Sequence, residues 1–313
     1  MSSTQFAGGV AGPGAAKAVK RREERAAKGG WGRGRTKSAA GSRPGWLTYT
    51  ILALVMMVSA YPLYYSFLLG SSDSVTIAQN PIPSLIPDGN FLENVQRVVS
   101  SDIKFWKAVA NSVIAATITS LAVVFFSTLA GYAFSKLRFR GRGPLLVFVV
   151  ATMAVPTQLS VVPLFILMSK LGWTGRLEAI IIPGLVTAFG VFWMTQYLES
   201  ALPYELIEAA RVDGCSMIRA FWHVAFPAAR PAATMLGLFT FIGSWTAFFW
   251  PFIALGSSNP TLPVAIQLLQ ASYFKDYSLI LAGVTVAALP LVVAFIFAGR
   301  QLVAGVMQGA VKG

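Results

Sequence analysis

The sequence has few charged residues and little of what metal or hydrolytic chemistry needs. Only 12% of its 313 residues are charged, whereas 55% are hydrophobic, and the mean hydropathy is +0.64. A soluble domain usually carries about a quarter of charged residues, so a membrane protein is predicted. A single cysteine, Cys215, and a single histidine, His223, leave no disulfide framework, no Cys/His metal cluster and no plausible catalytic set. We predict no catalytic residue, cofactor or metal, and therefore no enzyme.

The chain also lacks a nucleotide-binding loop. Lys37 and Ser38 follow Thr36 and not a glycine, so no Walker motif is formed. The sequence therefore offers no such route to ATP binding.

Positive charge is abundant but unevenly placed. The formal charge is +13, and ten of the 25 Lys and Arg residues fall within the first 45 positions, among Gly, Ala and Ser. Such a segment is typical of a disordered tail. We expect residues 1–45 to form a disordered, basic, cytoplasmic tail that does not bind nucleic acid, and residues 46–313 to form the membrane domain.

Six long uncharged runs predict six transmembrane helices. A crossing helix needs about 20 apolar residues, and each central charge costs roughly 2.5–3.5 kcal/mol. The runs are residues 46–70, 108–135, 144–169, 179–198, 231–255 and 277–299. Residues 261–274 are too short to cross and predict an amphipathic segment at the interface. We expect an all-α integral membrane protein in the cytoplasmic membrane of a prokaryote, in contact with lipid.

The loops differ in their positive charge, which predicts the orientation. Nineteen Lys and Arg residues fall in the two terminal segments and the segments 136–143 and 199–230, against six on the other side. Because positive loops stay in the cytoplasm, we expect both termini there. Residues 71–102 and 256–276 are expected to face outward.

Residues 204–231, YELIEAARVDGCSMIRAFWHVAFPAARP, predict a small helix-turn-helix on the cytoplasmic side. Gly214 suits the left-handed end of a first helix, Ser216 suits the cap of a second, and Pro227 is expected to stop that second helix. Apolar residues of the second helix recur at helical spacing and form one face. This periodicity alone leaves open whether the face binds a partner or packs onto the protein's own helices.

The order Glu208-Ala209-Ala210, Gly214, Val224 and Phe226-Pro227 resembles the EAA loop of ABC importer permeases. The resemblance covers residues 46 to 313 and is greatest for maltose-type sugar permeases, as in AGYAFSKLRFRGR at 130–142 and VPTQLSVVPLF at 155–165. It implies the type I importer permease fold and a helix-turn-helix that couples to an ATPase. The expected coupling residues are Glu208, Ala209, Ala210, Gly214, Ile218, Phe221, Trp222 and Pro227.

The resemblance also implies partners. They are a second homologous permease, a pair of ATP-binding subunits, an extracytoplasmic sugar-binding protein that docks on the outward segments, and a di- or oligosaccharide. Lys312 in the C-terminal tail is expected to reach the ATPases.

Candidate pathway-lining residues are Gln158 on a proline-rich stretch and Trp245, Phe248 and Phe249 on an aromatic stripe, although packing explains each as well. The alternative function is a carrier or channel without an ATPase. It predicts ionisable residues in the membrane and inverted repeats, and the six runs contain no Asp, Glu, Lys, Arg or His.

Overall fold

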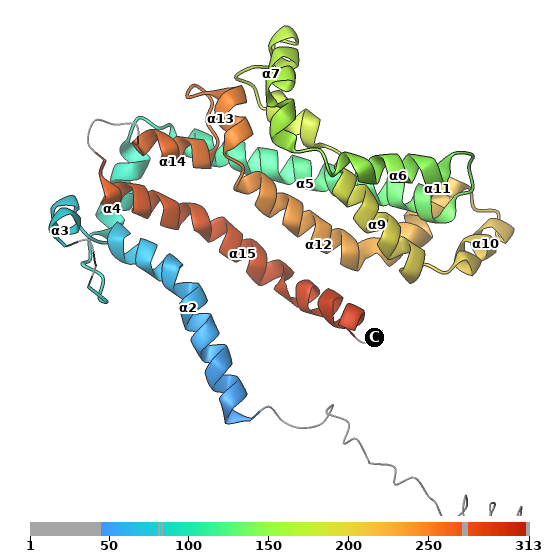
Figure 1. Ribbon diagram of the computed structural model, residues 1–313, viewed down its shortest axis with the longest axis horizontal. Helices are drawn as coiled ribbons and strands as arrows, with labels where there is room; N and C mark the ends of the chain where they lie inside the picture. Colours follow the sequence, from blue (N-terminus) through green and yellow to red (C-terminus); the bar gives the residue numbers. More distant parts are fainter. Residues whose placement is uncertain (1–44, 81, 83, 271–274, 311–313) are drawn as a thin grey trace, which may run out of the picture. The chain divides into compact units, whose positions relative to one another are not determined.

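The structure is a computed structural model that describes residues 45–80, 82, 84–270 and 275–310, with side chains except those of 298 and 300–310. Within these ranges the regular elements are helices and no strand occurs (Figure 1). The all-α prediction is confirmed. The predicted basic tail and Lys312 lie outside the described residues, except for Gly45 at the end of that tail.

The chain divides into two compact units, Met1–Ser59 and Ala60–Gly313, and α2 begins in the first. The helices are α2 (Trp46–Gly70), α3 (Ser74–Gln79), α4 (Phe91–Ser100), α5 (Phe105–Lys136), α6 (Arg142–Thr152), α7 (Val161–Lys170), α8 (Glu178–Ile181), α9 (Ala188–Ala201), α10 (Tyr204–Val212), α11 (Met217–Ala220), α12 (Phe226–Trp245), α13 (Phe249–Leu255), α14 (Leu262–Gln270) and α15 (Tyr277–Ala310).

Five helical stretches are long and apolar enough to cross a membrane. They are Trp46–Gly70, Phe105–Lys136, Glu178–Ala201, Met217–Trp245 and Tyr277–Phe297. A sixth candidate consists of two helices, Arg142–Thr152 and Thr157–Lys170, that meet at an angle of 88°. The predicted number of six therefore holds only if this bent pair counts as one span.

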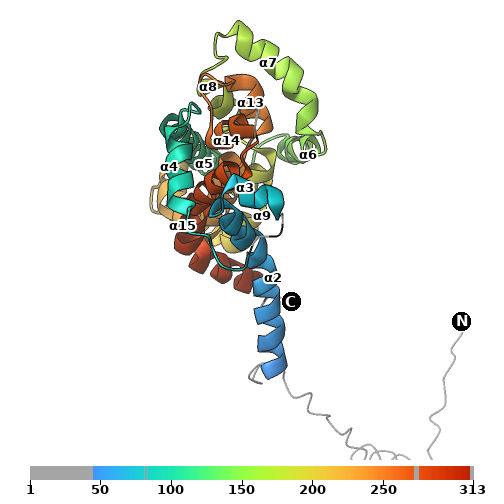
Figure 2. The same ribbon diagram turned by 90° about the vertical axis from the view of Figure 1, so that its left-hand side faces the viewer.

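The predicted span 144–169 is a bent pair of helices, and the bend falls in the proline-rich stretch around Pro156. The chain leaves α6 at Met153 and turns before a 3₁₀ turn, Thr157–Ser160, leads into α7. Pro156 lacks a backbone N–H and disfavours a helical conformation at Val155, so the α-helix cannot continue through this point. Figure 2 shows α7 standing away from α6.

The predicted span 231–255 is also shifted. The helix that contains Pro231 begins at Met217 and ends at Trp245, and α13 is a separate short helix after a break at Thr246–Phe248. Of the predicted interfacial segment 261–274, residues 262–270 form α14, which is too short to cross, and residues 271–274 lie outside the described residues. Val264 and Ala265 of α14 are fully buried in the protein.

Two of the three core clusters of the described residues lie along α5, and the third joins Met168, Ala179 and Ala254. Near the start of α5, Val98, Phe105 and Trp245 pack with α14 and α15. Near its end, Tyr132, Leu198 and Phe221 pack with α9, α10 and α12. These two clusters fix the outer helices against one central helix, as Figure 1 shows for α5, α9 and α12.

Small residues let these central helices approach closely. A Cβ at Gly131 of α5 would lie 2.7 Å from the backbone of Met194 in α9. On the α12 side, Ser120 donates a hydrogen bond of 2.7 Å to the carbonyl of Gly237. Small residues are the usual means of close helix packing in membranes.

Candidate functional site

The candidate site is the EAA module, residues 204–231, and its turn is built as the sequence predicts. Gly214 has φ of +79°, the left-handed region that suits glycine. The N–H of Gly214 donates to the carbonyl of Arg211 (3.0 Å), and that of Cys215 donates to the carbonyl of Ala210 (2.9 Å). This pair of bonds is the Schellman motif, so the last residue of the EAA triplet closes the turn.

The second helix of the module begins as predicted but does not end as predicted. Ser216 caps it, because its side chain accepts a hydrogen bond of 3.3 Å from the N–H of Arg219. The expectation that Pro227 stops the helix is wrong, since α11 passes through a π-helical turn, Phe221–Ala225, directly into α12. Pro227 stands in the first turn of α12, where its missing N–H is tolerated after the widened turn.

Phe221 is not available to a partner in this structure. Its side chain is 2% exposed and its ring centre lies 5.7 Å from that of Tyr132 on α5. The open question about the apolar face is therefore answered for Phe221, which packs onto the protein's own helices. Ala210 is buried as well, at 8% exposure. Phe221 and Ala210, which were expected to contact the ATPase, are therefore corrected: both lie inside the protein and support the module from there.

The other expected coupling residues reach the surface. Glu208, Ala209, Gly214, Ile218 and Trp222 are exposed, Ile218 at 72%, while Pro227 is half-buried. The structure adds two apolar residues that the sequence reasoning missed, Leu206 at 51% and Val212 at 87% exposure. For Val212 the signal in the sequence is its place between Arg211 and Asp213 on a helix expected to face water, whereas Leu206 has no such signal.

An apolar groove of about 280 Å³ lies beside the module. It is lined by residues of α5, α11 and the π-turn, namely Phe125, Leu129, Tyr132, Ala133, Leu137, Met217, Ile218, Phe221 and Trp222. Trp222 stacks on Phe125 with ring centres 5.9 Å apart, so the exposed end of the apolar face continues along α5.

The candidate pathway-lining residues do not form one surface. Trp245 is 2% exposed and its indole N–H donates to the carbonyl of Ala287 in α15 (3.1 Å), so its assignment to a pathway is corrected to the core. Phe248, in the break after α12, and Phe249, the first residue of α13, are exposed at 37% and 54%. Gln158 is exposed in the 3₁₀ turn before α7.

At the opposite end of α5 a polar joint holds the loop between α13 and α14. The side-chain amide of Asn111 donates to Oδ1 of Asn259 (2.9 Å) and to the carbonyl of Pro260 (2.8 Å). Lys104 and Lys107 both donate to the carbonyl of Ser258. Lys104 is also the one described non-glycine residue with positive φ, at 55°.

No metal-binding constellation is present in the described part of the chain. Within it, no three His, Cys, Asp or Glu side chains lie close enough together to hold an ion.

Similarity to known proteins extends over most of the second unit. The profile of the family described as "Binding-protein-dependent transport system inner membrane component" matches residues 123–304. Over 270 residues the chain is 30% identical to the arabinooligosaccharides transport system permease protein AraQ of Halalkalibacterium halodurans, which covers 86% of this chain and 96% of that protein. Over 265 residues it is 29% identical to the trehalose/maltose transport system permease protein MalG of Thermococcus litoralis, covering 83% of this chain and 94% of that one.

A solved structure shares the fold. The crystal structure of a bacterial ABC transporter involved in the import of the acidic polysaccharide alginate matches with a TM-score of 0.68 at 23% identity, over 81% of this chain and 94% of that chain.

Proposed function

This chain belongs to the family of binding-protein-dependent transport system inner membrane components, and from that premise we propose that its cargo is a sugar and that a second, homologous permease completes its pathway. As a member it is the membrane component of an ABC importer, a transporter subunit and not an enzyme, and it works with separate ATP-binding and substrate-binding components. The sequence-based prediction of the family is confirmed. The alternative of a carrier without an ATPase is not supported.

The relatives' names support a di- or oligosaccharide as cargo. One transports arabinooligosaccharides and another trehalose and maltose, and both align with more than four fifths of this chain. The structure supports a second permease in another way. In the described unit 60–313, several large apolar residues of the central helix α5 are exposed, among them Leu121 at 66% and Ile118 at 45%. Lipid or another apolar helix must cover such surface.

The EAA module is proposed to bind the ATP-binding subunit on the cytoplasmic side. The observation that carries this assignment is that Leu206, Val212 and Ile218 remain exposed on a module whose neighbouring apolar residues are buried. Burying each would contribute about 1.5–3 kcal/mol. Closure of the ATP-binding subunits on ATP would then move the module and open the pathway inward by alternating access.

Copurification of the intact importer tests this proposal. Glu208→Ala combined with Ile218→Ser changes two exposed side chains, so the chain should insert and fold normally while it loses the ATP-binding subunit. Glu93→Ala removes an exposed carboxylate from α4, outside the module, and serves as the control, which should retain that subunit. Retention of the ATP-binding subunit by the double variant at the level of the control would refute the assignment of the module.

A further inference from the structure

Two polar contacts join the end of α5 to the EAA module and to the helix before it. The hydroxyl of Tyr132 donates to the backbone carbonyl of Met217, the first residue of α11 (3.4 Å). One turn further, Lys136 Nζ donates to the carbonyl of Glu199 in the last turn of α9 (3.4 Å). The end of α5 therefore contacts both the second helix of the module and α9, the helix that precedes the module.

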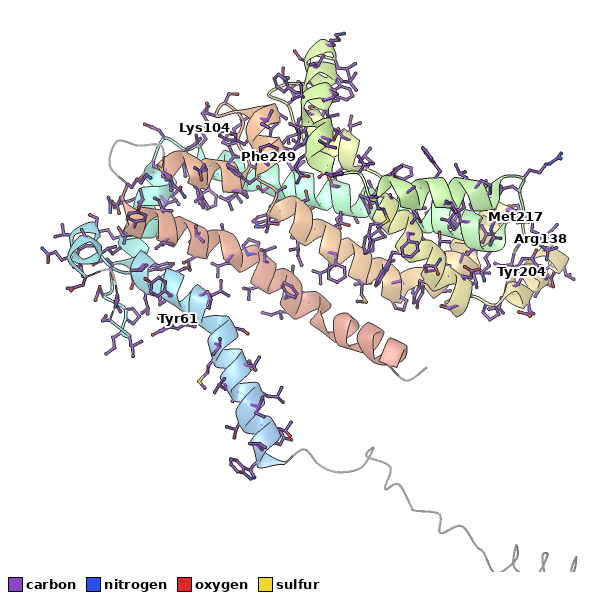
Figure 3. All side chains as sticks on the ribbon, viewed as in Figure 1. Tyr61, Lys104, Arg138, Tyr204, Met217 and Phe249 are labelled. Atoms are coloured by element: carbon purple, nitrogen blue, oxygen red, sulfur yellow. The ribbon has the colours of Figure 1, made fainter. Side chains whose placement is uncertain are left out.

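A third contact comes from the loop just after α5. The guanidinium of Arg138 lies 5.2 Å from the ring centre of Tyr204, the first residue of α10. Figure 3 shows Arg138, Tyr204 and Met217 gathered at the end of the molecule that carries α10 and α11, far from Lys104. Only Leu202 and Pro203 separate α9 from α10, so Arg138 and Lys136 hold the chain on either side of this short connection.

Lys136 is unusual because its side chain is buried, with 6% exposure. Lysines are almost never fully buried without a partner. Here the amine points to the C-terminal end of α9, where unpaired carbonyls and the helix dipole concentrate negative potential. The geometry thus gives the buried charge a specific place at the end of one helix.

Apolar packing also holds the module in place. Ile207 and Phe221 are buried at 1% and 2% exposure in the cluster below the module. The hydrophobic effect is not directional, whereas a hydrogen bond weakens steeply when its angle changes. The polar contacts at three separate points supply the directional restraint.

We propose that Tyr132, Lys136 and Arg138 form a clamp that makes the EAA module move as one body with α5 and α9. They are positioning residues, and they transmit the movement of the module to the helices. The proposal rests on the proposed function of the module. Without the clamp the ATP-binding subunit would still bind, but its closure would turn the module against α5 and leave α5 and α9 behind.

The test measures the distance between the module and α5 in the intact importer in lipid nanodiscs. One spin label is placed at Glu205→Cys, next to Tyr204, and the other at Leu121→Cys on the exposed face of α5. Both are introduced in a Cys215→Ser background. The distance is measured with and without ATP plus vanadate. We expect one narrow distance distribution in the unsubstituted protein. Arg138→Gln and Tyr204→Leu should each raise the fraction of molecules whose label distance departs from this narrow distribution roughly two- to five-fold. This factor corresponds to about 0.5–1 kcal/mol for an exposed cation–π contact.

Three variants show whether an effect on the distance comes from the lost contact, from the lost charge or from lost stability. Arg140→Gln removes the same charge from the same loop at an exposed residue and should leave the distribution narrow. Tyr204→Leu keeps every positive charge of the loop, so it remains informative if Arg138→Gln disturbs membrane insertion. The double variant Arg138→Gln/Tyr204→Leu should be no worse than either single variant, because both remove one contact.

The outcomes distinguish the clamp from the module's function. Retention of the ATP-binding subunit together with a broadened distribution supports the clamp. Unchanged distributions in both single variants, or equal broadening by Arg140→Gln, overturn it. Absence of the ATP-binding subunit from the unsubstituted complex would instead refute the proposed function, and the distance in the full chain would still test the clamp.

Discussion

At the scale of single residues, Gly214 acts through its backbone alone. Its φ is +79°, and no atom lies within 4 Å of the place that a Cβ would occupy. Gly214→Ala should therefore meet no clash, and its cost should be the left-handed conformation itself, about 1–2 kcal/mol. We expect a modest loss of thermal stability and a clear loss of the ATP-binding subunit during purification, because the turn that aligns α10 with α11 is altered.

Gly89 offers a matched control for that variant. It has φ of +91°, and a Cβ there would also have no atom within 4 Å, but the residue lies in the segment before α4. Gly89→Ala should therefore reduce stability by a similar amount and leave the ATP-binding subunit bound. Equal loss of that subunit in both variants would mean that backbone strain, and not the position of the turn, explains the effect.

At the scale of elements, the contact between α5 and α9 depends on the absence of a side chain. A methyl group on Gly131 would lie 2.7 Å from both the backbone and the Cβ of Met194, too close for any real Cβ. Gly131→Ala should push the two helices apart and destabilise the protein by about 1–3 kcal/mol. Thermal unfolding of the purified complex measures this, with Gly143→Ala, which meets nothing within 4 Å, as the variant that should change little.

The link between α4 and α15 should make stability depend on pH. Arg97 and Asp276 form an ion pair of 2.7 Å. Partial burial by itself would raise the pKa of Asp276, but hydrogen bonds from Ser278, Arg97 and the N–H of Leu279 together lower it below its ordinary value. A carboxyl with a lowered pKa stabilises the fold above its unfolded pKa, and the contribution is lost as pH falls through the folded value.

Thermal unfolding across the acid range tests this link. The unsubstituted protein should lose stability more steeply than Asp276→Asn as the pH falls below about 5, where the carboxyl of the unfolded chain begins to take up its proton, and on through the lower pKa of the folded carboxyl. Both proteins share Asp73, whose pKa is also lowered, chiefly by the backbone N–H of Thr76, so the difference between them isolates Asp276. Parallel curves would contradict a role for this ion pair.

The helices show how far a sequence predicts such a protein. Long uncharged runs correctly indicate where most of the spans lie, because the cost of burying charge in lipid depends on composition alone. The sequence indicates a kink at Pro156 but not its angle of 88°, and it does not indicate that Pro227 is accommodated after a π-turn, because both depend on local backbone geometry. Periodicity likewise finds the apolar face of the second module helix, but only packing decides that Phe221 is covered by Tyr132 while Ile218 stays exposed.

At the scale of the whole molecule, one helix connects the two functional ends of the described second unit. Near its start, α5 holds the loop between α13 and α14 through Asn111, and it ends at Lys136 beside the EAA module. A shift of the module that the clamp transmits to α5 would therefore also reach that loop. This continuity gives a physical route by which events at the ATP-binding subunit reach the loop between α13 and α14, in the segment 256–276 that is predicted to face outward.

The topology decides whether these two ends lie on opposite sides of the membrane. Between α4 and the EAA module the chain passes through α5, the bent pair and the stretch Glu178–Ala201. If the pair crosses, three crossings place α4 and the module on opposite sides; if it re-enters on one side, two crossings place them on the same side. The Lys and Arg count, 19 on the side that includes the module against six on the other, favours three crossings, with the module in the cytoplasm.

A membrane-impermeant maleimide distinguishes the two arrangements. Cys215, the chain's single cysteine, lies in the module, and Ser100 is an exposed residue at the end of α4. We expect Ser100→Cys in a Cys215→Ser background to be labelled in intact spheroplasts, and the native Cys215 to be labelled only after the membrane is permeabilised. Labelling of both positions in intact spheroplasts would show that the bent pair does not cross, and it would separate the module from cytoplasmic ATP and so refute its proposed coupling.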